Sequence, residues 1–310
     1  MRLPALAWTL LSLAPLAAQE EEPEDHSSRD LTAEQVEQRL DQVKRDLLPK
    51  VWTEKEAKDP VRAKKYLATW HAVTSEHYIL FTNGPTASCK KYAVTLEEQY
   101  ERVKKELPFE DVDHLLVCYI FKMPEEYYRF CGVATGWSEE QARATAGHAT
   151  SAYYACYYES PHSAVVFHEA THQIVGACLK VPGVGSWFQE GLAVYFEKKA
   201  VGEKPAGVVK SDIKSGNYYA LRDFFAIDTL LSDPQGNGHR NYAHAGALLD
   251  FLINTDEKPV AGKFGDFLAA ARRGRGFAYG GKASEKLIKE VYGLSADELE
   301  DVWKKHLGLR

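Results

Sequence analysis

The sequence lacks an excess of positive charge. It has 38 Lys and Arg residues against 44 Asp and Glu, a formal net charge of −6 and a pI of about 6.0. A general nucleic-acid binder presents a basic face, so we expect no nucleic-acid partner. The one basic cluster is Arg272, Arg273 and Arg275 beside Gly274 and Gly276, which we interpret as a solvated loop.

Long apolar runs are absent beyond the N-terminus, so no other segment is expected to span a bilayer. The one run, Leu3 to Ala18, follows Arg2 and precedes an acidic stretch. This layout is typical of a secretory signal peptide over residues 1–18, cleaved near Ala18. The acidic residues 19–30 are predicted to be disordered. We therefore expect a secreted or periplasmic protein with no stable membrane insertion.

The cysteines show no CxxC spacing, which argues against a cysteine zinc site. Export permits disulfides, and an odd number of cysteines leaves at least one thiol unpaired within the chain. Several lie in apolar runs and could equally be small buried residues. The sequence does not select a pairing among the five, which are Cys89, Cys118, Cys131, Cys156 and Cys178.

The remaining composition, 45% hydrophobic and 26% charged, is typical of a globular protein with a sizeable core. Residues 31–52 show helical spacing and a capping box between Thr32 and Gln35. Strands are predicted within 77–84, 114–121 and 147–158. Helices are predicted at 87–107 and from Pro124 into a glycine loop.

After residue 186 nearly all periodic segments are helical. They cover residues 186–199, 217–231, 239–254, 263–272, 283–292 and 295–307, with loops at 202–207 and 233–238. The fold class is therefore α+β. We expect residues 31–310 to form one unit, an α+β half at 31–185 and a helical half at 186–310, which could share one core.

The segment VVFHEATHQI, residues 165–174, contains an HExxH pattern. A helix is expected from Ser160 as N-cap, with Pro161 at the first helical position, to about Leu179. His168 and His172 then lie on one face, which suits two nitrogen ligands of a tetrahedral zinc ion. Glu169, at the edge of that face, is placed to act as a general base on water.

A third ligand is sought downstream, in GSWFQEGLAVYFEKK. Ser186 and Gln189 form a second capping-box pattern, so Glu190 falls in the first turn of a helix. Gly191 costs about 1 kcal/mol there relative to Ala, which indicates close packing against a neighbour. The alternative for Glu190 is a solvated carboxylate favoured by the helix dipole. Glu197 shares its face and could orient a ligand or pair with a nearby Lys.

Together these residues resemble the gluzincin metallopeptidases, in which HExxH is followed by a loop and then Glu in an E-G-x-A-x-Y helix. Here seventeen residues separate His172 from Glu190. The closest likeness is to secreted, bacterial-type peptidase MA-like proteins, which share the patterns H-E-x-x-H-Q and W-x-x-E-G-x-A-x-Y. Gln173 ends the first pattern here, and Trp187 begins the second. The resemblance implies a zincin-like catalytic domain with a small N-terminal mixed sheet, and one Zn²⁺ held by His168, His172 and Glu190.

The resemblance also implies an oxyanion-stabilising side chain from a later helix, Tyr242 or, as second choice, His244. It implies that the strand within 147–158 receives a peptide or protein substrate by β-augmentation. No G-x-M-E-N signature, which typical aminopeptidases have, precedes the motif. Recognition of a free α-amino group on the substrate is therefore not supported. Endopeptidase action or a narrow protein target stays open.

The predicted function is therefore that of an exported zinc metallopeptidase that uses Glu169 as general base. Two alternatives remain. One is a catalytically inactive or non-peptidase binding protein on the zincin scaffold. The other is a zinc hydrolase of a non-peptide amide or of cell-wall cross-links.

Overall fold

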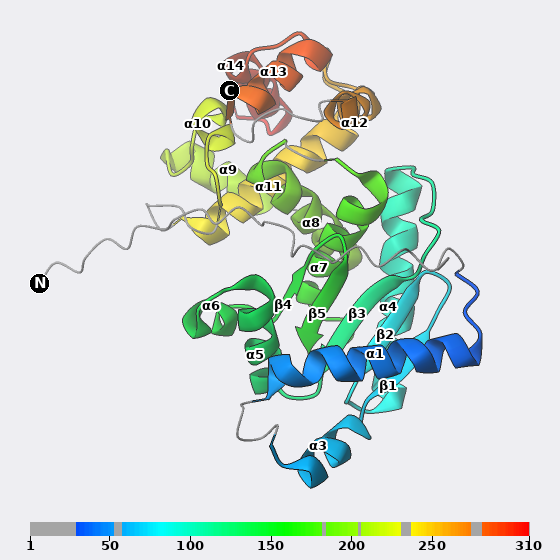
Figure 1. Cartoon of the computed structure of the whole chain (residues 1–310). Helices are drawn as coiled ribbons and strands as arrows, with labels where there is room; N and C mark the ends of the chain where they lie inside the picture. The colour runs from blue at the N-terminus through cyan, green and yellow to red at the C-terminus, as the bar shows by residue number, and fades with distance from the viewer. Residues whose placement is uncertain are drawn as a thin grey trace, which may run out of the picture.

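The computed structural model in Figure 1 describes residues 29–52, 58–181, 184–203, 206–230, 237–273 and 281–309. The predicted signal peptide, nearly all of the acidic segment, most of the 233–238 loop and Arg275 lie outside these residues. Arg29, near the end of the predicted disordered segment, is held in place: its Nε donates to Val112 O at 2.9 Å and its guanidinium pairs with Asp111. Within the described part, no helix combines the length and apolarity needed to cross a membrane.

A mixed five-stranded sheet is the centre of the N-terminal half. Its order is β1 (His71–Thr74), β2 (Tyr78–Thr82), β3 (Leu116–Phe121), β5 (Tyr153–Tyr157) and β4 (Gly147–Ala149). The three inner strands are parallel, and β1 and β4 pair antiparallel at the two edges. Together with the many helices, this sheet gives the α+β class that the sequence predicts.

Helices cover both faces of the sheet, as Figure 1 shows. One face packs against α1 (Ala33–Val51), α5 (Pro124–Thr135) and α6 (Glu139–Arg143), and the other against α4 (Thr86–Glu106) and α7 (Ala164–Ile174). The short helix α3 (Pro60–Leu67) leads into β1. Side chains of a strand alternate between faces, so Cys118 and Ile120 of β3 face α4 and α7, whereas Val117 and Tyr119 face α1 and α5.

The C-terminal half is helical and packs onto α7. A π-helical turn, η1 (Val175–Leu179), ends the α7 segment where the sequence predicts. Then follow α8 (Ser186–Ala200), α9 (Ala206–Ser215), α10 (Leu221–Phe225), α11 (Gly238–Asn254), α12 (Phe264–Arg273), α13 (Gly281–Tyr292) and α14 (Ala296–His306). One hydrophobic core runs from Tyr78 of the sheet to Trp303 of α14, so the two halves share a core.

Several elements differ from the sequence prediction. Strand β1 and the helices α3 and α6 were not predicted, and residues 147–158 form a hairpin rather than one strand. Thr150 makes the hairpin turn because its hydroxyl accepts the amides of Ala152 and Tyr153. Of the described residues in the predicted 217–231 helix, only 221–225 are helical, and Ala206, placed in a loop, begins α9.

Two predicted helix starts were wrong in detail. The Ser160 hydroxyl accepts from His162 N in the turn before α7, and Ser163 stands at the N-cap of that helix. Gly185 is the N-cap of α8, because the Ser186 hydroxyl accepts from Leu230 N and the Gln189 amide donates to Val181 O. Tertiary contacts thus use the side chains that the local pattern assigned to a capping box. The Thr32–Gln35 box at α1 is confirmed, with both hydrogen bonds present.

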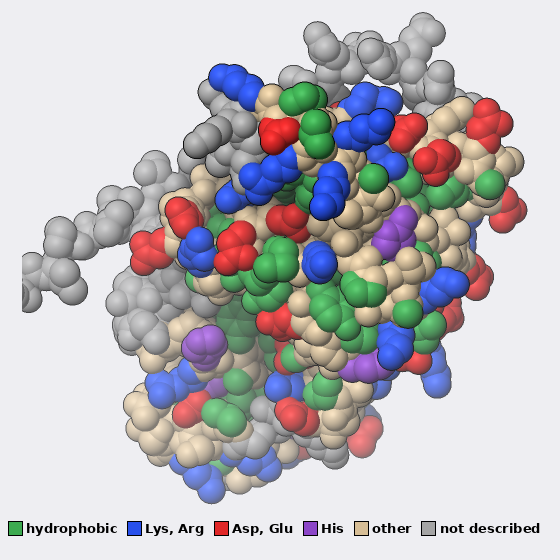
Figure 2. Space-filling model, turned by 90° about the horizontal axis from the view of Figure 1, so that it is seen from below, with side chains coloured by type: hydrophobic (Ala, Val, Ile, Leu, Met, Phe, Trp, Pro, Cys, Tyr) green, Lys and Arg blue, Asp and Glu red, His purple; other side chains and the backbone are tan. Residues whose placement is uncertain are grey.

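All five cysteines are buried free thiols. Of the two interpretations of the cysteines, the structure therefore agrees with small buried residues rather than disulfide partners. The surface carries mixed charge. On the face in Figure 2, acidic and basic side chains are interspersed around a hollow with hydrophobic side chains at its floor.

Candidate metal centre

Buried amide side chains fix the helix that carries HExxH. Gln99 of α4 donates from Nε2 to Thr171 Oγ1 at 2.8 Å and to Phe167 O at 3.2 Å. On the sheet side, Gln173 donates to Val117 O of β3 at 2.9 Å. These contacts join α7 to its neighbours through Gln99, Thr171 and Gln173, whose side chains are fully buried, so that the hydrogen bonds are costly to lose. The histidine-bearing face is thereby turned toward α8.

Three of the predicted residues converge at one point. His168 Nε2 lies 3.2 Å from His172 Nε2 and 3.2 Å from Glu190 Oε2, and His172 Nε2 lies 3.3 Å from the same oxygen. They are the one group of three or more His, Cys, Asp or Glu side chains among the described residues whose ligand atoms gather closely enough to hold an ion. The solvated-carboxylate alternative for Glu190 does not fit its position, because it faces both histidines.

The donor set suits zinc. Ligands at about 2.0–2.1 Å around a tetrahedral ion stand roughly 3.3–3.4 Å from one another, close to the three separations here. Two imidazole nitrogens and one carboxylate oxygen are a common catalytic zinc set, with a fourth position left for water. The residues present therefore fit the ion that the sequence predicts.

Glu197 holds the first histidine from the other side. Its Oε2 lies 3.1 Å from His168 Nδ1, and its second oxygen lies 3.6 Å from Lys198 Nζ. Glu197 therefore contacts both His168, which it was expected to orient, and a neighbouring lysine. Burial lowers the pKa of His168, but its hydrogen bonds with Glu190 and Glu197 outweigh burial and raise it to about 10. The site thus favours a cation.

Glu169 lies against the edge strand β4. A Cβ placed on Gly147 would come within 3.3 Å of Glu169 Cγ, so the glycine leaves room for this side chain. Burial raises the pKa of Glu169, although the two histidines and the backbone amide of Ala149 oppose the shift. A carboxylate with a raised pKa beside the three candidate ligands suits the role of general base that the sequence predicts.

Tyr242 and His244 point in different directions from α11. The Tyr242 ring stacks near His168, with centroids 6.0 Å apart. Burial, the charge of Glu190 and a hydrogen bond to that carboxylate raise the Tyr242 pKa. His244 is buried against α9, with Nε2 3.2 Å from Asp212 Oδ2. Residues two apart on a helix face nearly opposite ways, so of these two only Tyr242 lies beside the candidate metal cluster of His168, His172 and Glu190.

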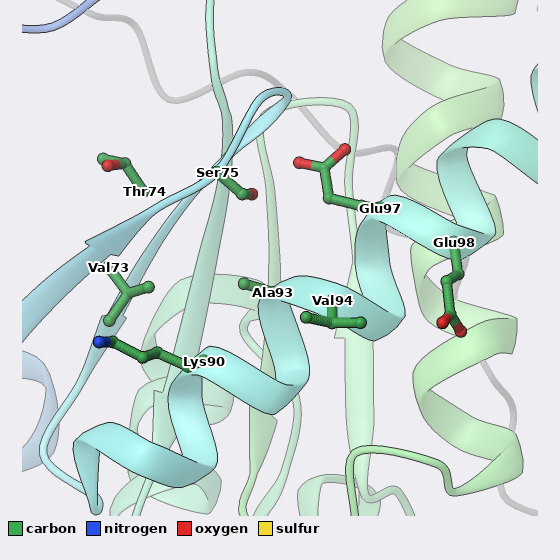
Figure 3. A pocket seen from close by; sticks show the side chains of 8 residues that line it. All are labelled: Val73, Thr74, Ser75, Lys90, Ala93, Val94, Glu97 and Glu98. Carbon is green, nitrogen blue, oxygen red and sulfur yellow. The ribbon is translucent and has the colours of Figure 1, made fainter.

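A separate pocket lies away from this cluster. Figure 3 shows it between the β1–β2 turn and α4, and its volume is about 430 Å³. Its lining includes Val73, Ser75, Ala93 and Glu97, and none of the metal-cluster residues contributes to it.

Two groups of residues at the site were not found from the sequence. Gln99 orients α7, and Gly147 and Ala149 flank Glu169. They lie on elements outside the motif, and no local spacing connects them with it.

Comparison with known protein families gives one match. Residues 162–269 match the family described as "Protein of unknown function (DUF1570)". The matched segment begins at the turn before α7 and ends within α12, so it contains the three candidate ligands, Glu169 and Tyr242. The search of curated proteins found no match.

Proposed function

We propose that this chain is an exported, zinc-dependent peptidase with a zincin-like catalytic domain of the gluzincin type. The observation that carries the proposal is the convergence of His168, His172 and Glu190 within 3.3 Å of one another, with Glu169 beside them. These are the groups that the HExxH resemblance assigns to metal binding and proton transfer.

When bound, zinc would supply a Lewis acid that polarises the scissile carbonyl and acidifies water. Glu169 would accept the proton of the attacking water and pass it to the leaving amine. The Tyr242 hydroxyl would donate a hydrogen bond to the developing oxyanion. Glu197 would keep the His168 ring in place and fix its tautomer through Nδ1.

The edge strand β4 supports a peptide as substrate. It borders Glu169 and, among the described strands, pairs with β5 alone, so its other edge is placed to pair with an extended chain. Peptide addition there would bring a substrate backbone past the general base.

Elemental analysis of the purified full-length chain tests the metal. We expect about one zinc per chain in the wild type, as one three-ligand site predicts. His172→Ala should lose it, because two ligands remain, whereas the exposed His162→Ala, outside the cluster, should keep it. A His172→Ala protein with full zinc would refute the ligand assignment.

Digestion of a broad peptide library by the zinc-loaded protein tests catalysis. We expect cleavage by the wild type and almost none by Glu169→Gln, whose amide cannot accept the proton of water. Zinc content should be equal in the two proteins. A zinc-loaded wild type that cleaves no peptide would favour the binding-protein alternative.

A further inference from the structure

Helix α8 packs closely against α11 at Gly191. A Cβ built on this residue would lie 2.6 Å from Leu249 Cδ2 and 2.8 Å from Ala245 O. The second contact is to backbone, so a side chain could fit only if α11 moved away from α8. The close packing expected for Gly191 is therefore confirmed, and the neighbour is α11.

Helices α8 and α11 each carry one residue of the proposed site, Glu190 on α8 and Tyr242 on α11. Gly191 follows the candidate ligand Glu190 on α8. On α11, Ala245 and Leu249 lie three and seven residues after Tyr242, so all three occupy the face that packs on α8. The spacing at Gly191 thus sets how far the Tyr242 hydroxyl stands from Glu190 and His168.

We infer that Gly191 is a positioning residue: its missing side chain brings α11 close enough for Tyr242 to reach the metal cluster. This inference rests on the proposed function for the role of Tyr242, but the positional claim concerns the chain alone. It does not require Gly191 to touch metal or substrate.

The backbone contact makes the inference specific. Were the Leu249 side chain the only obstacle, shortening it would accommodate a Cβ at position 191. Ala245 O cannot be shortened, so α11 must still shift in a Gly191→Ala/Leu249→Ala protein. Both Gly191→Ala and this double variant should therefore displace Tyr242, and the double variant is the one to measure should the single variant fail to fold.

Fluorine NMR of the full chain with 3-fluorotyrosine at position 242 tests the inference. We expect a single position-242 resonance in the metal-free wild type, shifted on adding one equivalent of zinc because the ring lies near His168. In Gly191→Ala and the double variant, the metal-free resonance should move and most of the zinc-induced shift should be lost. Zinc content should stay unchanged, because no ligand is replaced. Gly265→Ala is the matched control, since a Cβ there meets nothing within 4 Å.

An unchanged position-242 resonance in both variants would overturn the inference. Loss of zinc from both would also overturn it, because Gly191 would then act on Glu190 and not on Tyr242. If the wild type itself takes up no zinc, the proposed function fails, while the metal-free resonances still test the position of α11.

Discussion

The Nδ1 atom of His168 lies 3.1 Å from Glu197 Oε2, on the opposite side of the ring from the Nε2 that faces His172 and Glu190. The imidazole is therefore held at both nitrogens. A carboxylate on the outer nitrogen of a metal-binding histidine fixes its tautomer and raises its basicity as a ligand.

Replacing Glu197 should weaken metal binding without removing a ligand. We expect Glu197→Gln to lower zinc affinity roughly 10–100-fold, measured by competition with a chelator. Glu203→Gln is the matched control, because Glu203 also pairs with Lys198 but is exposed and lies outside the cluster. Equal zinc affinity in all three proteins would show that Glu197 does not tune the site.

The buried His148 of β4 should make folding sensitive to acid. Its Nδ1 lies 3.1 Å from the Tyr127 hydroxyl and its Nε2 3.2 Å from that of Tyr153. Burial lowers the His148 pKa from 6.5 to about 4. Between these values the unfolded chain binds the proton and the folded chain does not, so the free energy of unfolding falls as pH drops through this window.

The predicted loss reaches at most about 3 kcal/mol by pH 4 and is absent above the unfolded pKa. Denaturant unfolding at several pH values between 4 and 7 measures it. His148→Gln should flatten the pH dependence, whereas the exposed His239→Gln should leave it as in the wild type. Parallel curves for His148→Gln and the wild type would contradict this account.

The sequence was most informative where a residue's role depends on spacing within one element. Apolar periodicity predicted α1, α4 and α14 because each buries one stripe. The i, i+4 spacing placed His168 and His172 on one face for the same reason. The α8 segment was placed correctly although its predicted cap was wrong, since a helix survives loss of one capping interaction.

Contacts between distant elements were beyond this reasoning. The helix pattern alone could not decide whether Tyr242 or His244 faces the metal cluster, because that depends on how α11 rotates against α8 and α9. Gly147 was read only as part of a strand, and its approach to Glu169 follows from the place of β4 at the sheet edge. The hairpin turn at Thr150 was missed because it has no glycine or proline.

The contact between Gln99 and Thr171 should couple α4 to α7, the helix that carries HExxH. We expect Thr171→Val to cost about 1–3 kcal/mol of stability, because it leaves the buried Gln99 amide with one acceptor fewer. A double-mutant cycle with Gln99→Leu, followed by denaturant unfolding, measures the coupling. Additive effects would indicate that the 2.8 Å contact contributes nothing of its own.

The proposal that the protein is exported predicts a shortened N-terminus. The apolar Leu3–Ala18 run followed by acidic residues should be removed by signal peptidase. Mass spectrometry of the protein from its native host should therefore find a mature chain that begins near Gln19. An intact Met1 on cytosolic protein would contradict the export proposal and leave the peptidase proposal to be tested by itself.

The last prediction separates Tyr242 from His244. If the Tyr242 hydroxyl stabilises the oxyanion, Tyr242→Phe should retain zinc and the native fold but lower kcat about 10²–10³-fold. KM should change little, because the hydrogen bond matters mainly in the transition state. His244→Ala should leave kcat near the wild-type value and lower the melting temperature, because it removes a buried imidazole that contacts Asp212 and leaves Arg240, 3.4 Å away, to pair with that carboxylate.

Kinetics with a peptide found in the library digest, together with thermal melting of both variants, provide the comparison. The opposite pattern, with Tyr242→Phe fully active and His244→Ala inactive at unchanged zinc content, would transfer the role to His244. It would also require α11 to rotate from the position seen here, because His244 now faces α9 and Tyr242 faces His168.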